Sequence, residues 1–145
     1  MKTSMLLPVV VAVLLLGGCG ARDPVVAGKV FLIRHCDYEP MGGGLTNRGR
    51  KQAAGIAGKL KAEKIGLILH SPVKRCDETA RIVWERLGKP EIRSVYWLHE
   101  HSKEASEWCS KVGGVNVLIV THTPVIHQMT EKPSATNFGK VTRLK

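Results

Sequence analysis

Short apolar runs recur along the chain, and the segments between them carry apolar residues at helical spacing. Most runs are continuous rather than alternating, which is typical of a strand that is buried on both faces in a parallel sheet; the run at 92–98 is mixed, because it contains Arg93 and Ser94. Strands that alternate with helical segments predict an α/β fold of three layers (α/β/α), with helices on both faces of a mostly parallel sheet. The four expected strands are residues 29–34, 65–69, 92–98 and 115–120.

Two of the intervening segments have an apolar stripe that defines a helix. In each, four apolar residues occupy positions one turn apart, so one face of the helix is apolar. The first helix is expected to begin at Thr46 or Asn47, because either side chain can act as an N-cap. Two further helices are expected at 103–112 and 123–129, and an edge strand at 139–144. The two stripes are Ala53, Ile56, Ala57 and Leu60, and Ala80, Val83, Trp84 and Leu87.

The beginning of the chain follows a different pattern. Lys2 precedes a mostly apolar run at residues 6–16, which is shorter than the ~20 residues of a membrane-spanning helix, and Leu16-Gly17-Gly18-Cys19 follows. This arrangement resembles a bacterial lipoprotein signal, in which Cys19 becomes the lipidated N-terminus. A plain signal peptide with an incidental cysteine is the alternative. We therefore expect a signal peptide at 1–18, a tether at 19–28 and one domain at 29–145, anchored in the cell envelope at the outer membrane or periplasmic face.

The charge of the chain narrows the class of partner. The sequence has 22 Lys and Arg against 12 Asp and Glu, a formal net charge of +10, and only 5% of its residues are aromatic. A basic, exported chain with few aromatic residues is not expected to bind nucleic acid. Phosphate chemistry or an anionic membrane surface fits the excess of positive charge better.

Polar residues of one kind end three of the expected strands. Arg34-His35 follows the first, His70-Ser71 the second and Thr121-His122 the fourth. Because the carboxyl ends of parallel strands meet at one edge of a sheet, these side chains are expected to share that edge. Arg75 stands near the start of the next helix, where backbone N–H groups and the helix dipole also attract anions. The sequence therefore predicts a pocket that binds an oxyanion such as phosphate.

Four motifs in this order resemble the histidine phosphatase superfamily, and most closely its short phosphohistidine phosphatase branch. The resemblance covers about residues 29–129 and implies a phosphoglycerate mutase-like fold. The motifs are Leu32-Ile33-Arg34-His35, Leu45-Thr46-x-x-Gly49-x-x-Gln52-Ala53, Ser71-Pro72-x-x-Arg75-x-x-x-Thr79-Ala80 and Val120-Thr121-His122-x-Pro124.

The resemblance also implies a mechanism. His35 would attack phosphorus and carry the phosphoryl group, while Arg34, Arg75 and His122 would stabilise the charge on the equatorial oxygens. Such fixed cations need no metal and no cofactor. The proton donor is expected to be Glu100, in the context Leu98-His99-Glu100. An ordinary surface carboxylate at this position, in an enzyme without a dedicated acid, is the alternative.

Cys36 departs from the family pattern, which has a small residue directly after the histidine. With Cys19 lipidated, three cysteines remain (Cys36, Cys76 and Cys109), and their spacing is not that of a zinc site. An exported protein can form a disulfide, and a Cys36–Cys76 bridge is a hypothesis that rests on both residues flanking the expected pocket. Three unpaired thiols, buried or partly exposed, are the alternative. A cysteine phosphatase is excluded, because the arginine that it needs six residues after Cys36 is Gly42.

The remaining sequence-level alternatives concern function. A binding lipoprotein that holds a phosphate ligand but turns it over poorly is the main rival to an enzyme. A mutase is less well supported, because the chain lacks the insertions of the larger mutases. The partner is expected to be a phosphorylated small molecule, or a phosphorylated protein or glycan. Among the other histidines, His70 is expected to line the pocket wall or cap the strand, and His127 to lie on a helix surface. His99 and His101 are expected to be exposed in a loop, and a pair of metal ligands is the alternative.

Overall fold

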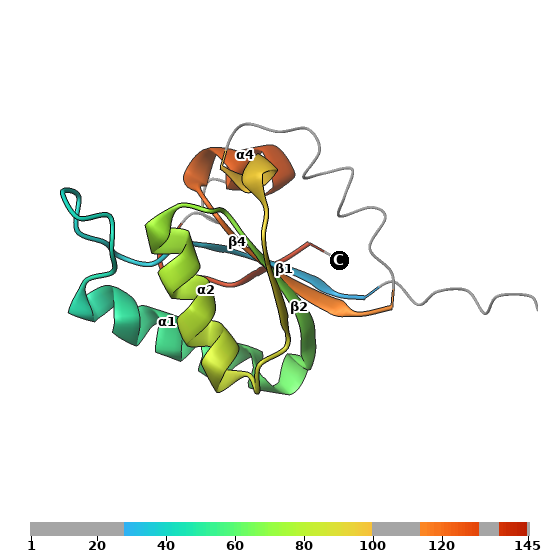
Figure 1. Ribbon diagram of the computed structural model, residues 1–145. Helices are drawn as coiled ribbons and strands as arrows, with labels where there is room; N and C mark the ends of the chain where they lie inside the picture. Colours follow the sequence, from blue (N-terminus) through green and yellow to red (C-terminus); the bar gives the residue numbers. More distant parts are fainter. Residues whose placement is uncertain (1–27, 100–113, 131–136, 145) are drawn as a thin grey trace, which may run out of the picture.

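The computed structural model describes residues 28–99, 114–130 and 137–144. Within these ranges the chain alternates between strands and helices, as the apolar runs predict, and Figure 1 shows the helices arranged around one twisted sheet. The elements are β1 (Val30–Arg34), α1 (Asn47–Leu60), η1 (Lys61–Glu63), β2 (Ile65–His70), α2 (Lys74–Arg86), β3 (Glu91–Ser94), η2 (Tyr96–Leu98), β4 (Asn116–Thr121), α4 (Thr123–Thr130) and β5 (Thr142–Arg143).

The sheet has five strands in the order β3-β2-β4-β1-β5. β1, β2, β3 and β4 are parallel, and β5 pairs with β1 in the antiparallel direction, so the tail does form an edge strand. Arg34 lies opposite Thr121 at the carboxyl ends of β1 and β4, and His70 lies opposite Val120. The three polar strand ends therefore meet at one edge of the sheet, as expected from parallel pairing.

Two apolar layers hold the helices against the sheet. Alternate residues of β1 point to opposite faces, so Phe31 and Ile33 pack with α1 and α2, while Val30 and Leu32 pack with α4. Figure 1 shows α1 and α2 side by side on one face and α4 on the other. This is the three-layer α/β arrangement that the sequence predicts.

The third strand is shorter than predicted, and the expectation of a strand over 92–98 was wrong at its carboxyl end. β3 is an edge strand that ends at Ser94, and the chain then turns into the 3₁₀ helix η2. Leu98 at the end of η2 is fully buried in the layer that contains α4. Its carbonyl oxygen accepts a hydrogen bond of 2.7 Å from the Thr121 hydroxyl. Burial of Leu98, rather than continued sheet pairing, sets the path of this segment.

The remaining helix predictions agree with the structure where it describes them. Thr46 caps α1, because its hydroxyl accepts a hydrogen bond from the Gly49 N–H at 2.9 Å. The expected helix at 103–112 lies outside the described residues. Among the described residues, no helix is long and apolar enough to cross a membrane.

Candidate active site

His35 lies directly after β1, at the carboxyl edge of the sheet. Its backbone N–H donates to the Thr121 carbonyl oxygen at 3.0 Å, which continues the pairing of β1 with β4, and the side chain is only 3% exposed. The ring atom Nδ1 lies 3.0 Å from the Cys36 carbonyl oxygen. Because a carbonyl oxygen only accepts hydrogen bonds, Nδ1 carries the proton, and Nε2 of the neutral ring has a lone pair. In this tautomer Nε2 is the ring atom that can accept a hydrogen bond or form a bond to an electrophile.

Arg75, in the first turn of α2, joins His35 to the second histidine. Its Nε donates to His35 Nε2 at 3.2 Å, and its Nη2 lies 3.3 Å from His122 Nδ1. Because arginine can only donate, His122 Nδ1 is an acceptor, and its Nε2 carries the proton that it gives to the Ser71 hydroxyl at 2.9 Å. The two imidazole rings are 5.3 Å apart. The sequence prediction that these residues converge is correct.

Both histidines are held neutral by their surroundings. Burial is the main cause that lowers the pKa of His35 to about 4; the Cys36 carbonyl opposes this, and the charges of Arg75 and Arg34 add to it. Burial first, and then Arg75, lowers the pKa of His122 to about 3. Neutral His35 is the form that can attack phosphorus, and its low pKa keeps it in that form down to mildly acidic conditions.

Arg34 completes the positive charge at this edge. It is the last residue of β1, and burial lowers its pKa from the ordinary value, although the side chain keeps its charge. Its charge acts on His35 and on His122. Two guanidinium groups next to two neutral imidazoles form a site for a doubly charged oxyanion, since planar guanidinium groups match the oxygens of a phosphoryl group.

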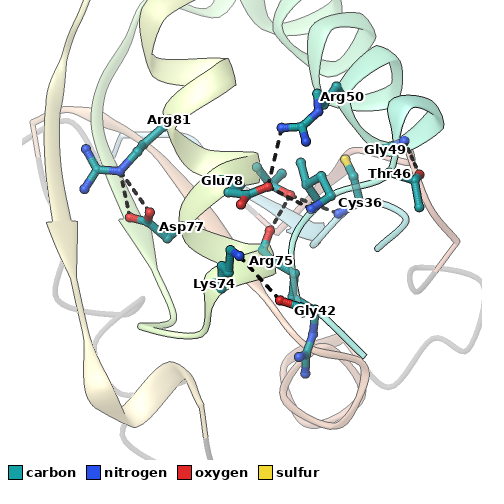
Figure 2. Close-up of polar contacts among 12 residues, drawn as sticks. Cys36, Gly42, Thr46, Gly49, Arg50, Lys74, Arg75, Asp77, Glu78 and Arg81 are labelled. Carbon is teal, nitrogen blue, oxygen red and sulfur yellow. Dashed lines mark hydrogen bonds and ion pairs between the residues drawn. The ribbon is translucent and has the colours of Figure 1, made fainter. Parts of the chain in front are cut away.

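The loop after His35 is held by the second sequence motif. The Asp37 N–H donates to the Gln52 side chain at 2.9 Å, and the Thr46 hydroxyl donates to the Asp37 carboxylate at 2.7 Å. Gly49 packs so closely that a Cβ there would lie 2.0 Å from the Asp37 carbonyl oxygen. In Figure 2, Thr46 and Gly49 are joined at the start of α1. These motif residues are therefore structural: they fix the direction in which the chain leaves His35.

Thr79 connects the same loop to α2. Its hydroxyl accepts the Cys36 N–H at 3.0 Å and donates to the Arg75 carbonyl oxygen at 2.7 Å. Nearby, Lys74 reaches the Gly42 carbonyl oxygen in the glycine-rich loop, and the acidic residue Glu78 accepts from the Leu45 N–H at 2.7 Å (Figure 2). The strand end that carries His35 and the helix start that carries Arg75 are thus one hydrogen-bonded unit.

The hypothesis of a Cys36–Cys76 bridge was wrong. Both residues are free thiols, fully buried in the apolar layer under α1 and α2. Burial raises the pKa of Cys36 to about 11 and that of Cys76 to about 12. Cys76 does border the site, with its Sγ 3.5 Å from His122 Nε2. Cys36, the departure from the family pattern, is a packed residue of the same apolar layer.

The other histidines fall as follows. His70 is buried, with Nδ1 2.9 Å from the Ser71 carbonyl oxygen and Nε2 3.7 Å from Asp77. His127 is exposed on α4. His99 is exposed as predicted, yet its ring lies 5.6 Å from that of His122. Glu100, His101 and Cys19 lie outside the described residues.

Sequence reasoning missed three side chains of the site. Ser71 belongs to one of the motifs, but its hydrogen bond to His122 was not predicted. Tyr38 and Phe138 were given no role, although both rings lie near that of His35, at 5.1 and 5.9 Å. Tyr38 follows His35 closely enough to have been considered, whereas nothing in the sequence marks Phe138.

Two other kinds of site are a metal centre and a cavity away from the histidines. The described residues contain no group of three or more His, Cys, Asp or Glu side chains that could hold a metal ion. A cavity of about 230 Å³ lies between α1 and α2, lined by Ala54, Ala57, Gly58, Lys61 and Arg86. Its lining is at the opposite ends of these helices from Arg75, and it is separate from the histidine site.

The sequence model of the histidine phosphatase superfamily (branch 1) matches residues 30–103, half of the chain. The protein belongs to this superfamily. The matched residues include His35 and Arg75, which belong to the first and third of the four motifs.

Solved structures of the same fold agree with this assignment. SixA from Agrobacterium tumefaciens, described as a phosphohistidine phosphatase, is 20% identical with a TM-score of 0.64, over 80% of this chain and 90% of that one. The protein histidine phosphatase SixA in complex with tungstate is 22% identical, with a TM-score of 0.63 and coverage of 79% and 93%. Phosphoglycerate mutase from Plasmodium falciparum is 26% identical, with a TM-score of 0.59 and coverage of 79% and 80%. A search of curated protein sequences gives no significant match.

Proposed function

We propose that the protein is a phosphatase that transfers the phosphoryl group of its substrate to His35 and then to water. The observation that carries this proposal is the contact of Arg75 with both His35 Nε2 and His122 Nδ1, at 3.2 and 3.3 Å. One guanidinium thereby places a positive charge beside the nucleophilic nitrogen. A transferred phosphoryl group carries its negative charge on three equatorial oxygens, which such a group stabilises.

In the first step the bond between His35 Nε2 and phosphorus forms as the bond from phosphorus to the leaving group breaks. Arg34 and Arg75 hold the phosphoryl oxygens. His122 joins them by taking up a proton on Nδ1 when the anionic substrate enters, since its Nε2 proton is held by Ser71. Glu100 donates a proton to the leaving group. In the second step the Glu100 carboxylate takes a proton from water as the water oxygen attacks phosphorus. The bond between phosphorus and His35 Nε2 breaks, inorganic phosphate leaves, and neutral His35 and protonated Glu100 are restored. This scheme uses fixed cations in place of a metal ion.

The substrate of this reaction is a phosphorylated small molecule, or a phosphorylated protein or glycan. The similar structures are named as enzymes that handle phosphohistidine or phosphoglycerate. We further propose that lipid on Cys19 anchors the protein in the cell envelope, as the first residues of the sequence suggest. Mass spectrometry of the membrane fraction tests this part, and unmodified Cys19 would contradict it.

The central test replaces the nucleophile. His35→Ala is expected to abolish phosphate release from a generic aryl phosphate, while the wild-type protein retains a phosphoryl group that is stable in base and labile in acid. His127→Ala is the matched control, because that histidine is exposed on α4. Wild-type turnover in His35→Ala would overturn the mechanism. Phosphate binding without release in the wild-type protein would instead support a binding lipoprotein.

A second pair of variants tests the arginine clamp. Arg75→Met is expected to reduce kcat by about 10²–10³-fold, the usual effect of removing one group that stabilises the transition state. Arg81→Met is the matched control on the same helix. Arg81 pairs with Asp77 and lies on the opposite side of α2 from the Glu78–Arg50 pair (Figure 2). Equal losses in the two variants would show that positive charge on α2, and not the contact with His35, affects the rate.

A further inference from the structure

An aromatic ring lies over each of the two arginines of the site. The Arg34 guanidinium carbon is 4.1 Å from the centre of the Phe138 ring, and that of Arg75 is 4.7 Å from the centre of the Tyr38 ring. Both rings also lie beside His35, at ring distances of 5.1 Å for Tyr38 and 5.9 Å for Phe138. Two aromatic side chains from distant parts of the sequence therefore flank the nucleophile.

This stacking is compatible with phosphate binding. A ring over a guanidinium covers its face, where the attraction between cation and π electrons is strongest. The N–H donors that bind a phosphoryl oxygen lie in the plane of the guanidinium and point past the ring. The aromatic rings are thus next to a bound phosphoryl group without competing for its oxygens.

The two rings are more exposed than the two histidines. His35 and His122 are 3% and 7% exposed, whereas Phe138 is 37% exposed and Tyr38 is half-buried. In phosphoryl transfer the attacking and leaving atoms are roughly in line on opposite sides of phosphorus. Since the nucleophile is at the buried end of the site, the leaving group points toward solvent. Tyr38 and Phe138 are partly exposed and lie beside the nucleophile, so they can line this exit.

Both rings are held in position by the backbone. Tyr38 forms an isolated bridge with Leu45, and the neighbouring Glu39 N–H donates to the Gly44 carbonyl oxygen at 2.8 Å. Next to Phe138, the Gly139 carbonyl oxygen accepts a hydrogen bond of 2.9 Å from Lys59 on α1. A preformed site loses little conformational freedom when a ligand binds, which favours selection by shape.

We propose that Tyr38 and Phe138 form the leaving-group site, and that this site selects planar aromatic leaving groups over saturated ones of similar size. The inference rests on the proposed phosphatase function, and it adds the class of group attached to the phosphate. An aromatic leaving group would make favourable contacts with the edges and open faces of these rings. A saturated ring is thicker and lacks the matching charge distribution.

The test compares two substrates whose leaving groups differ only in planarity. Benzyl phosphate and cyclohexylmethyl phosphate both release a primary alkoxide, so their intrinsic reactivities are similar. The full-length protein is expected to hydrolyse benzyl phosphate with a kcat/KM about three to ten times higher, the range expected for one or two aromatic pairs. Tyr38→Leu and Phe138→Leu should each reduce this ratio, and the double variant should bring it close to one.

The ratio separates selection from positioning. Loss of a ring that orients Arg75 or Arg34 would slow both substrates equally and leave the ratio unchanged. Tyr38→Phe, which retains the ring, should keep the preference. Tyr96→Leu is the control, because Tyr96 is 70% exposed and its described ring contact is with His99. The ratio should not change in that variant.

The outcomes distinguish this inference from the proposed function. Equal kcat/KM values for the two substrates in the wild-type protein would overturn the inference and leave the phosphatase intact. Failure to hydrolyse any phosphate would overturn the proposed function. In that case calorimetric binding of benzylphosphonate and cyclohexylmethylphosphonate tests the aromatic site without turnover. Tighter binding of benzylphosphonate that depends on Tyr38 and Phe138 supports the inference, and equal binding overturns it.

Discussion

Lowering the pH from about 7 to about 4.5 should destabilise this protein through two histidines in its active site. His35 and His122 are buried and neutral in the folded state, with pKa values of about 4 and about 3. In the unfolded chain each has the ordinary value of about 6.5. The folded pKa is the lower one, so the unfolded state binds more protons as the pH falls below about 6.5. Above about pH 6.5 the full stability is present, and it falls as the pH drops from about 6.5 toward the pKa values of the folded state.

The magnitude follows from these pKa values. At about pH 4.5 an unfolded histidine is almost fully protonated, while His35 and His122 in the folded protein remain mainly neutral. Proton linkage then gives a loss of about 2–3 kcal/mol for each histidine, and about 5 kcal/mol for the pair. Domains of this size typically have a total stability of about 5–15 kcal/mol. The expected loss is therefore large enough to bring the protein near its unfolding midpoint.

Urea unfolding at the two pH values measures this loss. Trp84 and Trp97 pack against the two apolar layers, so their fluorescence should report unfolding on both faces of the sheet. His122→Asn removes one titrating group and should retain only about half of the pH dependence. His127→Asn, on the exposed face of α4, should behave like the wild type. An unchanged free energy of unfolding of the wild type between the two pH values would contradict the low pKa values of the two histidines. A loss in His122→Asn as large as that of the wild type would contradict the contribution of His122.

Three further predictions concern the residues that support the site. Gly49→Ala should lower the free energy of unfolding by about 1–3 kcal/mol, because its Cβ would lie 2.0 Å from the Asp37 carbonyl oxygen; Gly58→Ala, which meets no atom within 4 Å, should stabilise the exposed face of α1 in the same urea assay. Thr79→Val leaves the buried Cys36 N–H without its acceptor and should lower the free energy of unfolding by about 1–3 kcal/mol. Thr79→Ser retains the hydroxyl and should recover most of this loss; no recovery would contradict a role for the hydroxyl. The acidic limb of kcat/KM should fall near pH 4, the pKa of His35; a limb near 6.5 in steady-state rates would contradict a buried neutral nucleophile.

The oxyanion site was largely predictable because its residues stand at the ends of strands. A continuous apolar run identifies a buried parallel strand, and parallel pairing brings the carboxyl ends together without knowledge of any side-chain contact. This is why Arg34, His35 and His122 could be placed at one edge from spacing alone. Arg75 was placed there by its position at the start of a helix that follows such a strand. The family resemblance then supplied the expected roles.

The path of the chain after β3 was not predictable in the same way. Residues 92–98 read as one strand, but an edge strand gains pairing on one side only, so its length is decided by what the next residues can bury. Here Leu98 finds a place in the apolar layer on the α4 side, and the strand stops at Ser94. The cysteines gave a similar result, because proximity to the site did not reveal that both thiols are buried in the core.

The fold class and the meeting of the polar strand ends at one edge of the sheet could be predicted from the sequence, because they depend on periodicity and strand direction. Only the tertiary structure decided that His35 is neutral, which of its nitrogens has the lone pair, and that aromatic rings flank it. These properties arise from contacts between residues far apart in the chain, such as Arg75 with His35 and Phe138 with Arg34. Burial and protonation depend on the complete surroundings of a group, which no local pattern specifies.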